Sequence, residues 1–277
     1  MISVLIFGAV IGGIWALVAS GFSLIFGVMR ILNFGHGAIF VASAYMAIFV
    51  SKICYPLSLP SALLVGVLFG LMFYTITKPV RENEVAVIIV TLATALLIQQ
   101  ILLSIFGDRG LTMQPLLRGV VNLFGVRFTV MRIFSIVIAL TVLIALEVMM
   151  RTRFGKKIEA VSEDFESAML VGINVERVYI FVMVLSSILA SLAGYFYVQI
   201  FSVNPELSLR ALIYAFAIVI LGGLGSVRGS ILASFIIGYI VALTITLLGS
   251  RWSEFVMLLT IILTLIVKPS GIFGVEE

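Results

Sequence analysis

Side chains that could act as nucleophiles, acid–base catalysts or metal ligands are few and widely separated in this sequence. The 277 residues include one histidine, His36, and one cysteine, Cys54. A multi-histidine metal site is therefore ruled out, and Cys54 has no histidine other than His36 to activate it. The Gly-x-Ser-x-Gly motif of serine hydrolases does not occur either. The sequence predicts no catalytic residue, no metal site and no enzymatic activity for this chain.

The longest polar run, 151–177, carries five basic and five acidic residues. Apolar residues within it recur at helical spacing and predict an amphipathic helix over 159–172, with Gly172 ending it in a left-handed conformation; they are Ala160, Phe165, Ala168 and Met169. Such a helix can lie in the lipid interface or fit a groove on a partner protein. Acidic residues on its polar side disfavour anionic lipid, so the sequence favours a protein partner.

The composition of the chain indicates an all-α polytopic membrane protein formed by a single domain, 1–277. Hydrophobic residues make up 62% and charged residues 11%, against about 25% charged in soluble domains. The mean hydropathy is +1.30. The net charge of +4 arises from basic residues in short loops, a pattern of membrane topology. We therefore expect contact with membrane lipid and no binding of nucleic acid.

The apolar residues divide into nine segments, of which 211–224 and 253–267 barely span a bilayer at about 1.5 Å per residue. The sequence thus predicts a bundle of eight or nine transmembrane helices, some of them interrupted. The nine segments are 2–29, 37–53, 59–77, 85–106, 130–150, 178–200, 211–224, 229–249 and 253–267. The mixed polar and β-prone stretch 107–129 is predicted to be an external loop, which either receives a partner or caps the bundle.

The distribution of Lys and Arg predicts the orientation. Ten of these residues fall on the side that includes 151–177, and seven fall on the opposite side. The seven are Lys52, Arg109, Arg118, Arg127, Arg132, Arg210 and Arg251. The positive-inside rule then places 151–177 and the C-terminus in the cytoplasm and the N-terminus outside.

Two groups of polar residues are candidates for a translocation path. The joint between the first two segments places Asn33 and His36 beside glycines, Gly37 among them. Interrupted helices are tolerated where their backbone is buried in protein or lines a wet cavity. The joint is therefore either a helix break on the path or a cytoplasmic turn with one satisfied histidine. In the fourth segment, Gln99 and Gln100 are costly in lipid, so at least one should face protein or water.

The spans contain no energy-coupling chemistry of their own. Acidic residues lie mainly in loops, which argues against a proton-coupled carrier, and no nucleotide-binding motif occurs. Glu147 lies four residues before Arg151, a spacing that predicts an ion pair along one helix face. If the protein moves solute uphill, another chain must supply the energy.

Four patches of the sequence resemble the branched-chain amino acid ABC transporter permeases of the LivH type. They are GKKIEAVSEDFESAMLVGINVERV in 155–178, ILNFGHG in 31–37, LGGLGS in 221–226 with Gly229, and KPSGIFG in 268–274. They follow one another in the order found in the family and extend over nearly the whole chain. Two features depart from the family: Arg228 replaces a common proline, and 107–129 is difficult to match.

The resemblance implies a permease subunit of an importer in the cell inner membrane. Its partners would be a second, homologous permease of the LivM type, two cytoplasmic ATPases that bind ATP and Mg²⁺, and a periplasmic or extracellular solute-binding protein. No cofactor would belong to this chain itself. The residues implied in ATPase coupling are Glu159, Ala160, Glu163, Asp164, Ala168, Gly172 and Asn174. Alternative functions are a permease for urea, amides or another small polar solute of the same superfamily, and a stand-alone secondary carrier or channel.

Overall fold

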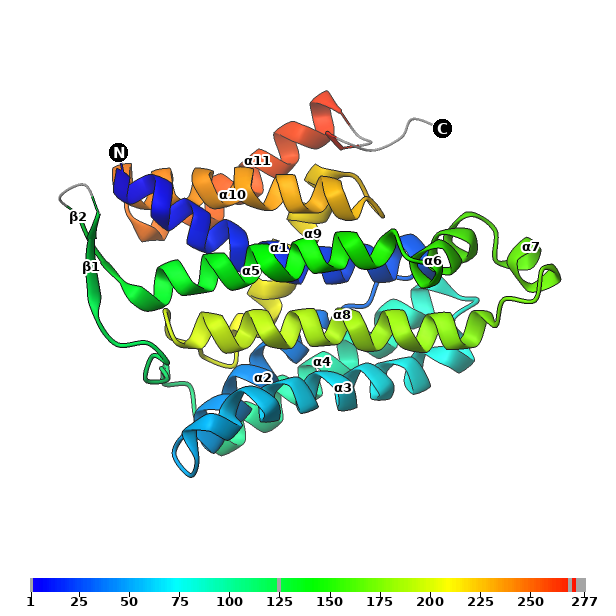
Figure 1. The fold of residues 1–277 in the computed structure, drawn as a ribbon, viewed down its shortest axis with the longest axis horizontal. Coiled ribbons are helices and arrows are strands. Elements are labelled where there is room, and N and C mark those ends of the chain that lie inside the picture. The colour runs from blue at the N-terminus through cyan, green and yellow to red at the C-terminus, as the bar shows by residue number, and fades with distance from the viewer. Residues whose placement is uncertain (1, 124–125, 269–270, 273–277) are drawn as a thin grey trace.

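Six long apolar helices form the body of the protein. The computed structural model describes residues 2–123, 126–268 and 271–272. Within these residues six helices are long and apolar enough to cross a membrane, which requires about 20 residues. They are α1 (Ile2–Met29), α3 (Ser58–Thr77), α4 (Glu84–Phe106), α5 (Val130–Met150), α8 (Val175–Val198) and α10 (Val227–Leu247). They lie roughly parallel along the long axis of the molecule (Figure 1).

Three shorter apolar helices complete the bundle: α2 (His36–Ser51), α9 (Leu207–Gly222) and α11 (Ser253–Val267). The first two have 16 residues each, a length of about 24 Å that falls short of the ~30 Å hydrocarbon layer. The described part of the chain therefore contains nine apolar helices, one for each predicted segment. The predicted all-α bundle is confirmed, with only six of the nine helices long enough for a full crossing.

The two ends of the bundle carry different small elements. At one end, the strands β1 (Val120–Leu123) and β2 (Val126–Thr129) form an antiparallel hairpin within the predicted loop 107–129. At the other end, α6 (Arg153–Glu163) and α7 (Phe165–Leu170) project beyond the long helices (Figure 1). We refer to these as the hairpin end and the α7 end. Three short 3₁₀ turns link helices: η1 (Tyr55–Leu57), η2 (Lys78–Val80) and η3 (Ser250–Trp252).

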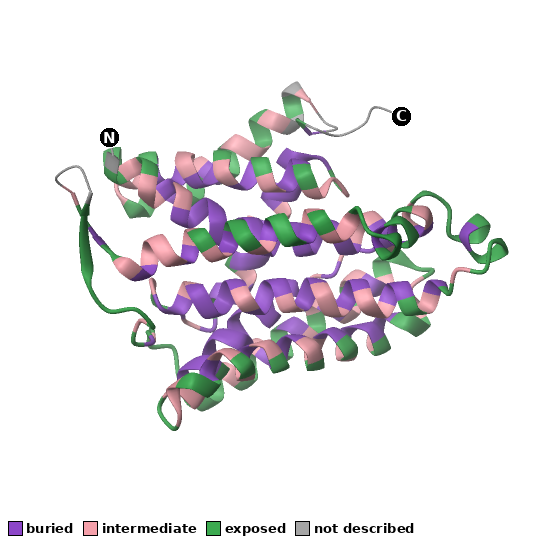
Figure 2. Ribbon diagram, viewed as in Figure 1, coloured by how far each residue is buried: buried purple, intermediate pink, exposed green. Residues whose placement is uncertain are grey.

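The core lies along α1 and α8. The α1 helix packs along α10 and also against α5, α8 and α9, while α8 packs against α2 and α3. Both central helices are mostly buried, whereas α4 and α5 expose large apolar side chains on their outer faces (Figure 2). Exposed apolar faces on long helices are the expected surface toward lipid. The chain is a multi-pass membrane protein.

Polar capping residues fix the places where two helices enter the bundle from the α7 end. Asn83 caps α4 by accepting a hydrogen bond from the Ala86 amide at 3.1 Å. Ser226 caps α10 in the same way through the Gly229 amide, also at 3.1 Å. Side-chain caps of this kind satisfy backbone amides that have no partner within the helix. The C-terminal patch 268–274 lies partly outside the described residues.

Candidate functional site

The α7 end carries the polar run 151–177, which folds into two helices where one was predicted. The prediction of a single helix over 159–172 is wrong, because Asp164 adopts an extended conformation (φ −152°, ψ 106°) between α6 and α7. Its Oδ1 atom accepts the Glu166 and Ser167 amides at 2.9 and 3.1 Å, and its Oδ2 atom accepts the Ser167 hydroxyl at 2.5 Å. Aspartate is favoured at a helix N-cap, so Asp164 ends α6 and begins α7. The hydrogen bonds from Ser167 and Glu166 lower the pKa of the Asp164 carboxyl.

The predicted left-handed glycine at the end of this segment is confirmed. Gly172 has φ +83°. Its amide donates to the Met169 carbonyl at 3.0 Å, and the Ile173 amide donates to the Ala168 carbonyl at 3.0 Å. These two bonds form the Schellman motif that closes a helix. Asn174 then caps α8 through the Arg177 amide at 3.0 Å, so the chain reverses from α7 into α8 within a few residues.

The α7 helix presents an apolar surface to solvent. Leu170 is 89% exposed and Val171 77% exposed, and Phe165 and Met169 are about half exposed. We call these four residues the apolar tip. The predicted apolar side of the helix is therefore divided, since Ala168 is buried and Ala160 half-buried, while Phe165 and Met169 remain about half exposed. A cluster of large apolar side chains on a projecting helix is typical of a protein-binding surface.

The residues implied in ATPase coupling lie mostly on the surface of this element. Glu159, Glu163, Asp164, Gly172 and Asn174 are exposed, Ala160 is half-buried, and Ala168 is buried. The α6 helix rests on the bundle through Gly155, Ile158 and Val161, which are buried against α1, α5 and α8. The acidic residues of the element are thus exposed, and the small and branched residues hold the element to the bundle.

An ionic cluster links the end of α5 to the start of α10, just before the α6–α7 element begins. Glu147 pairs with Arg151 at 3.2 Å, as its spacing predicted. The same carboxylate accepts a hydrogen bond from the Arg228 Nε atom of α10 at 3.1 Å. Arg228, noted in the sequence as a departure from the resembling family, therefore links α10 to α5 next to α6.

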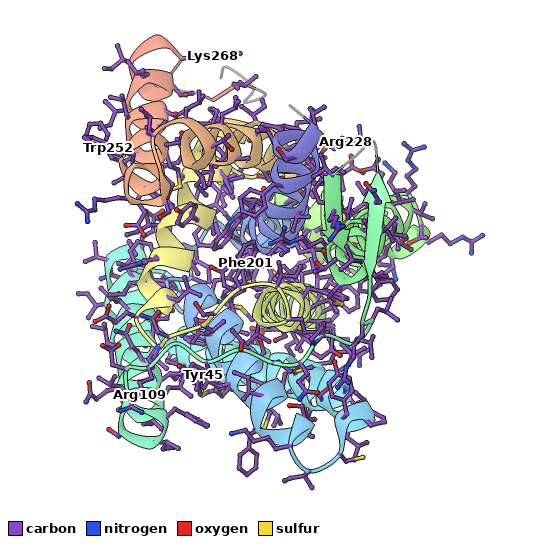
Figure 3. The ribbon with its side chains drawn as sticks, turned by 90° about the vertical axis from the view of Figure 1, so that its left-hand side faces the viewer. Tyr45, Arg109, Phe201, Arg228, Trp252 and Lys268 are labelled. Carbon is purple, nitrogen blue, oxygen red and sulfur yellow. The ribbon has the colours of Figure 1, made fainter. Side chains whose placement is uncertain are left out.

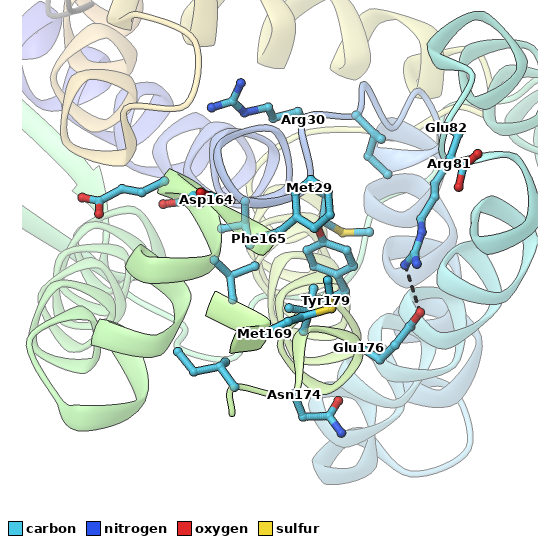
Figure 4. A pocket seen from close by; sticks show the side chains of 17 residues that line it. Met29, Arg30, Arg81, Glu82, Asp164, Phe165, Met169, Asn174, Glu176 and Tyr179 are labelled. Carbon is cyan, nitrogen blue, oxygen red and sulfur yellow. Dashed lines mark hydrogen bonds and ion pairs between the residues drawn. The ribbon is translucent and has the colours of Figure 1, made fainter. Parts of the chain in front are cut away.

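A second ionic cluster lies where the element returns to the bundle. Glu176, in the first turn of α8, pairs with Arg81 at 3.0 Å and with Lys78 at 3.6 Å, and the Tyr74 hydroxyl also donates to it. The Arg81–Glu176 pair is drawn in Figure 4. Neither link between helices, Arg228 to Glu147 or Arg81 to Glu176, was predicted from the sequence. The link to Glu176 could have been anticipated. Lys78 and Arg81 lie in a short loop that the sequence places on the same side of the membrane as Glu176.

A cavity of about 740 Å³ lies between α7 and the bundle (Figure 4). Phe165 and Met169 line it from α7, Tyr179 from α8, and Met29 from the end of α1. The α7 helix is thus held by its ends and by the buried Ala168, with open space beneath much of it. The element is attached to the bundle mainly through α6, whose buried residues pack against α1, α5 and α8.

The joint between α1 and α2 lies inside the bundle. The His36 Nε2 atom is 3.0 Å from the Val18 carbonyl oxygen. Val18 precedes the end of α1 by eleven residues, or about 16 Å along the helix. Asn33 is also buried, and its Oδ1 atom accepts the Gly35 amide at 3.0 Å. The alternative of a surface turn therefore does not fit, because the chain turns back into the protein and α2 begins at mid-depth.

The first turns of the two short helices α2 and α9 meet at this depth. A Cβ atom added to Gly37 would overlap the Ser208 carbonyl oxygen and lie 2.9 Å from the Leu212 amide nitrogen. The Ser208 hydroxyl donates to the Gln99 Oε1 atom at 2.8 Å. The crossing of α2 and α9 thus brings Gly37 and Gln99 together beside His36. Gln100, in contrast, is exposed on the outer face of α4.

Replacing Asp164 should separate its capping role from its charge. Asp164→Ala removes both acceptors, so the amides of 165–171 are expected to exchange hydrogen about fivefold faster. Asp164→Asn keeps an acceptor oxygen and should leave exchange close to the wild-type rate. Hydrogen–deuterium exchange with mass spectrometry measures both. Equal protection of α7 in the Ala variant would contradict the assignment of Asp164 as the cap.

Comparisons with known proteins agree with this architecture. The family model described as "Branched-chain amino acid transport system / permease component" matches residues 4–265. The high-affinity branched-chain amino acid transport system permease protein LivH of Escherichia coli K12 is 26% identical, covering 98% of this chain and 94% of LivH. BraD of Pseudomonas aeruginosa, named as a permease protein of the same kind of system, is 25% identical, with 99% and 95% covered.

A solved structure shares the fold. The structure titled "PsaBC from Streptococcus pneumoniae in complex with Fab" aligns with a TM-score of 0.53 at 13% identity, covering 97% of this chain and 91% of that chain. The family match extends over nearly the whole sequence and includes both the interrupted helices and the α6–α7 element. The chain belongs to the family of permease components of branched-chain amino acid transport systems, and is a multi-pass inner-membrane protein without enzymatic activity of its own.

Proposed function

We propose that this chain is one permease subunit of an ATP-driven importer for branched-chain amino acids, and that an ATPase subunit binds its apolar tip. The observation that carries the proposal is the exposure of Leu170 and Val171 on a helix that projects beyond the bundle. Glu166, one helical turn before Leu170, and the exposed Glu163 disfavour an anionic membrane surface, whereas a groove on a protein accommodates an apolar tip with acidic residues close by in the chain.

The proposed orientation places the α7 end in the cytoplasm and the hairpin end outside. Dense basic residues of 151–177 favour the cytoplasmic side, which also puts the N-terminus outside and the C-terminus in the cytoplasm. Two ATPases would bind ATP and Mg²⁺ below the α7 end. A periplasmic or extracellular binding protein would deliver the solute at the hairpin end, and a second, homologous permease would complete the membrane part.

The two ionic clusters give a physical route for coupling. A movement of the ATPase that displaces the apolar tip would act on α6 and α7 as a unit, with the cavity beneath α7 leaving room for it. Because α6 rests on α5 and α7 on α8, the displacement would pass through Glu147 of α5 to α10 and through Glu176 of α8 to α3 and η2. Ion pairs can be rearranged at low cost when they are half exposed, which suits a joint that moves in every cycle.

The crossing of α2 and α9 is the proposed gate of the translocation path. Asn33, His36, Gly37 and Gln99 lie at or beside it, and the Nδ1 atom of His36 is buried without a hydrogen-bond partner among the described residues. Interrupted helices at mid-depth are typical of solute paths in transporters. Gln100 faces away from the crossing on the outer face of α4, and we assign it to the contact with the second permease, where its amide can find a partner.

Reconstitution of the complete transporter tests the proposed function. Proteoliposomes that contain both permeases and the ATPases should take up leucine only when ATP is present on the ATPase side and binding protein on the other. Vesicles with this chain alone should show no gradient-driven flux. Uptake of urea or an amide in preference to leucine would support the alternative solute. Flux through the chain alone would instead establish a secondary carrier or channel.

A further inference from the structure

A second pocket lies at the hairpin end, opposite the α7 element. Its volume is about 480 Å³, within the range of roughly 300–1,000 Å³ that is common for small-molecule sites. Residues of α1, α8, α9, α10 and the start of α11 line it. Figure 3 looks onto this end of the molecule, with Phe201 near its middle and Trp252 toward one side. The pocket therefore opens on the side where the solute would arrive.

Aromatic side chains form one wall of this pocket. The ring of Trp15 stacks on Tyr214 with centroids 4.8 Å apart and an angle of 9° between the planes. Tyr197 meets Trp15 edge-on at 6.2 Å, and Phe201 packs against Tyr197 at 4.9 Å. The opposite side of Trp15 stacks on Phe40 of α2 at 5.6 Å. The aromatic wall thus separates the pocket from the crossing of α2 and α9.

An ion pair lies in the same pocket. The Arg210 Nη1 atom of α9 is 3.2 Å from the Glu254 Oε1 atom of α11, and both side chains are about half exposed. A half-exposed ion pair contributes little to the stability of a fold, because water solvates both charges well when they separate. The pair therefore places a positive and a negative charge side by side next to the aromatic wall. Because neither charge contributes much to the stability of the fold, both are free to bind a solute.

We propose that this pocket is the first site in the membrane for the transported amino acid. Arg210 would bind the carboxylate and Glu254 the ammonium group. The half-buried rings of Tyr214 and Phe201, with Trp15 packed behind Tyr214, would receive the branched aliphatic side chain. The proposal rests on the function proposed above and adds the recognition of the zwitterion. When an amino acid inserts between Arg210 and Glu254, its carboxylate replaces Glu254 as the partner of Arg210 and its ammonium group replaces Arg210 as the partner of Glu254. The Arg210 guanidinium can donate two parallel hydrogen bonds to the carboxylate.

The charge arrangement predicts selectivity between related solutes. A solute with a carboxylate alone leaves Glu254 without a partner, and an amine alone leaves Arg210 without one. Leucine should therefore bind more tightly than 4-methylpentanoate, which lacks the ammonium group, and than 3-methylbutylamine, which lacks the carboxylate. Urea carries neither charge and has no branched side chain for the aromatic wall.

Fluorescence of Trp15 can report the binding directly. The chain contains two tryptophans, so Trp252→Phe leaves Trp15 as the only one. The full-length variant, purified in lipid nanodiscs, would be titrated with leucine and the two single-charge analogues up to millimolar concentration. Leucine is expected to change the emission of Trp15 in a saturable way. Absence of a response to leucine in this variant would overturn the proposal.

Substitutions of the two charges separate recognition from a merely structural role. In the Trp252→Phe background, Arg210→Gln should weaken leucine binding about tenfold and remove the preference for leucine over 3-methylbutylamine. Glu254→Gln should instead remove the preference over 4-methylpentanoate. Arg109→Gln and Glu206→Gln are matched controls, because both are exposed at the hairpin end outside the pocket. Leucine affinity that is unchanged in both pocket variants would refute the assignment.

The complete transporter distinguishes this proposal from the proposed function itself. Arg210→Gln and Glu254→Gln should lower leucine uptake about tenfold while the binding protein still stimulates ATP hydrolysis. Loss of both uptake and stimulation would place these residues in coupling, contrary to the proposal. A wild-type transporter that fails to take up leucine would refute the importer function instead, whatever the pocket binds.

Discussion

Leu170→Asp is expected to lower ATP-driven leucine uptake about 100-fold while the chain still inserts into the membrane. Leu170 is 89% exposed, so its replacement removes almost no packing within this chain. In the proposed complex, however, the new carboxylate would be buried in the groove of the ATPase without a partner. Loss of a central apolar contact at an interface commonly costs about 2–4 kcal/mol, or roughly 30-fold to 1,000-fold in affinity.

Co-purification of the ATPase with the detergent-solubilised permease measures this loss alongside uptake. Val120→Asp is the matched control, since it places the same charge on an exposed apolar residue at the hairpin end. We expect the control to bind the ATPase and transport leucine as the wild type does. Normal co-purification and uptake by the Leu170→Asp variant would show that the apolar tip is not the ATPase contact.

The fold could be predicted from the sequence because the length of an apolar run is a strong signal that depends only on neighbouring residues. Each of the nine apolar runs became a helix, and the helix ends fall at the capping and turn residues that the sequence contains, such as Asn83 and Ser226. The depth of α2 was harder to predict. Whether the joint at Asn33 and His36 lies at the surface or inside depends on the neighbours that receive it, here Val18 and Ser208.

The α6–α7 element shows where a local pattern fails. Apolar spacing over 159–172 suits one continuous helix, and helical periodicity alone gives no sign of a break. The break occurs at Asp164 because its carboxylate accepts hydrogen bonds from the first amides of α7, whereas aspartate is unfavourable in the interior of a continuous helix. The segment predicted to bind a partner is exposed at the end of the bundle, but the helical pattern divided its apolar residues incorrectly between the buried and exposed sides.

Contacts between segments that are distant in the sequence could not be predicted from local sequence patterns. Glu176 meets Arg81 across 95 residues, and Arg210 of α9 meets Glu254 of α11 with the whole of α10 between them in the chain. In the sequence, Arg210 had only the role of an orientation charge on the outer side. Its place beside an acidic residue and an aromatic wall follows from the packing of α1, α9 and α11, which no single-segment pattern encodes.

Gly37→Ala should force the two short helices α2 and α9 apart with a single added methyl group. The added Cβ atom would overlap the Ser208 carbonyl oxygen and approach the Leu212 amide nitrogen, both of which are backbone atoms. No change of side-chain rotamer can relieve such an overlap, so α2 and α9 must move apart. Overpacking of this kind costs about 1–3 kcal/mol. We expect an apparent melting temperature several degrees lower and uptake reduced about tenfold or more.

Gly13→Ala is the matched control, because its added Cβ atom would meet only the Ala139 Cβ atom at 3.4 Å, an ordinary contact. Thermal unfolding in detergent, followed by uptake in proteoliposomes, measures both effects for each variant. If Gly37→Ala retained wild-type stability and uptake, the close crossing of the two short helices would not be required. If stability fell while uptake per folded molecule stayed normal, the crossing would be a packing contact. Loss of uptake beyond the loss of folded protein is the result expected of a gate.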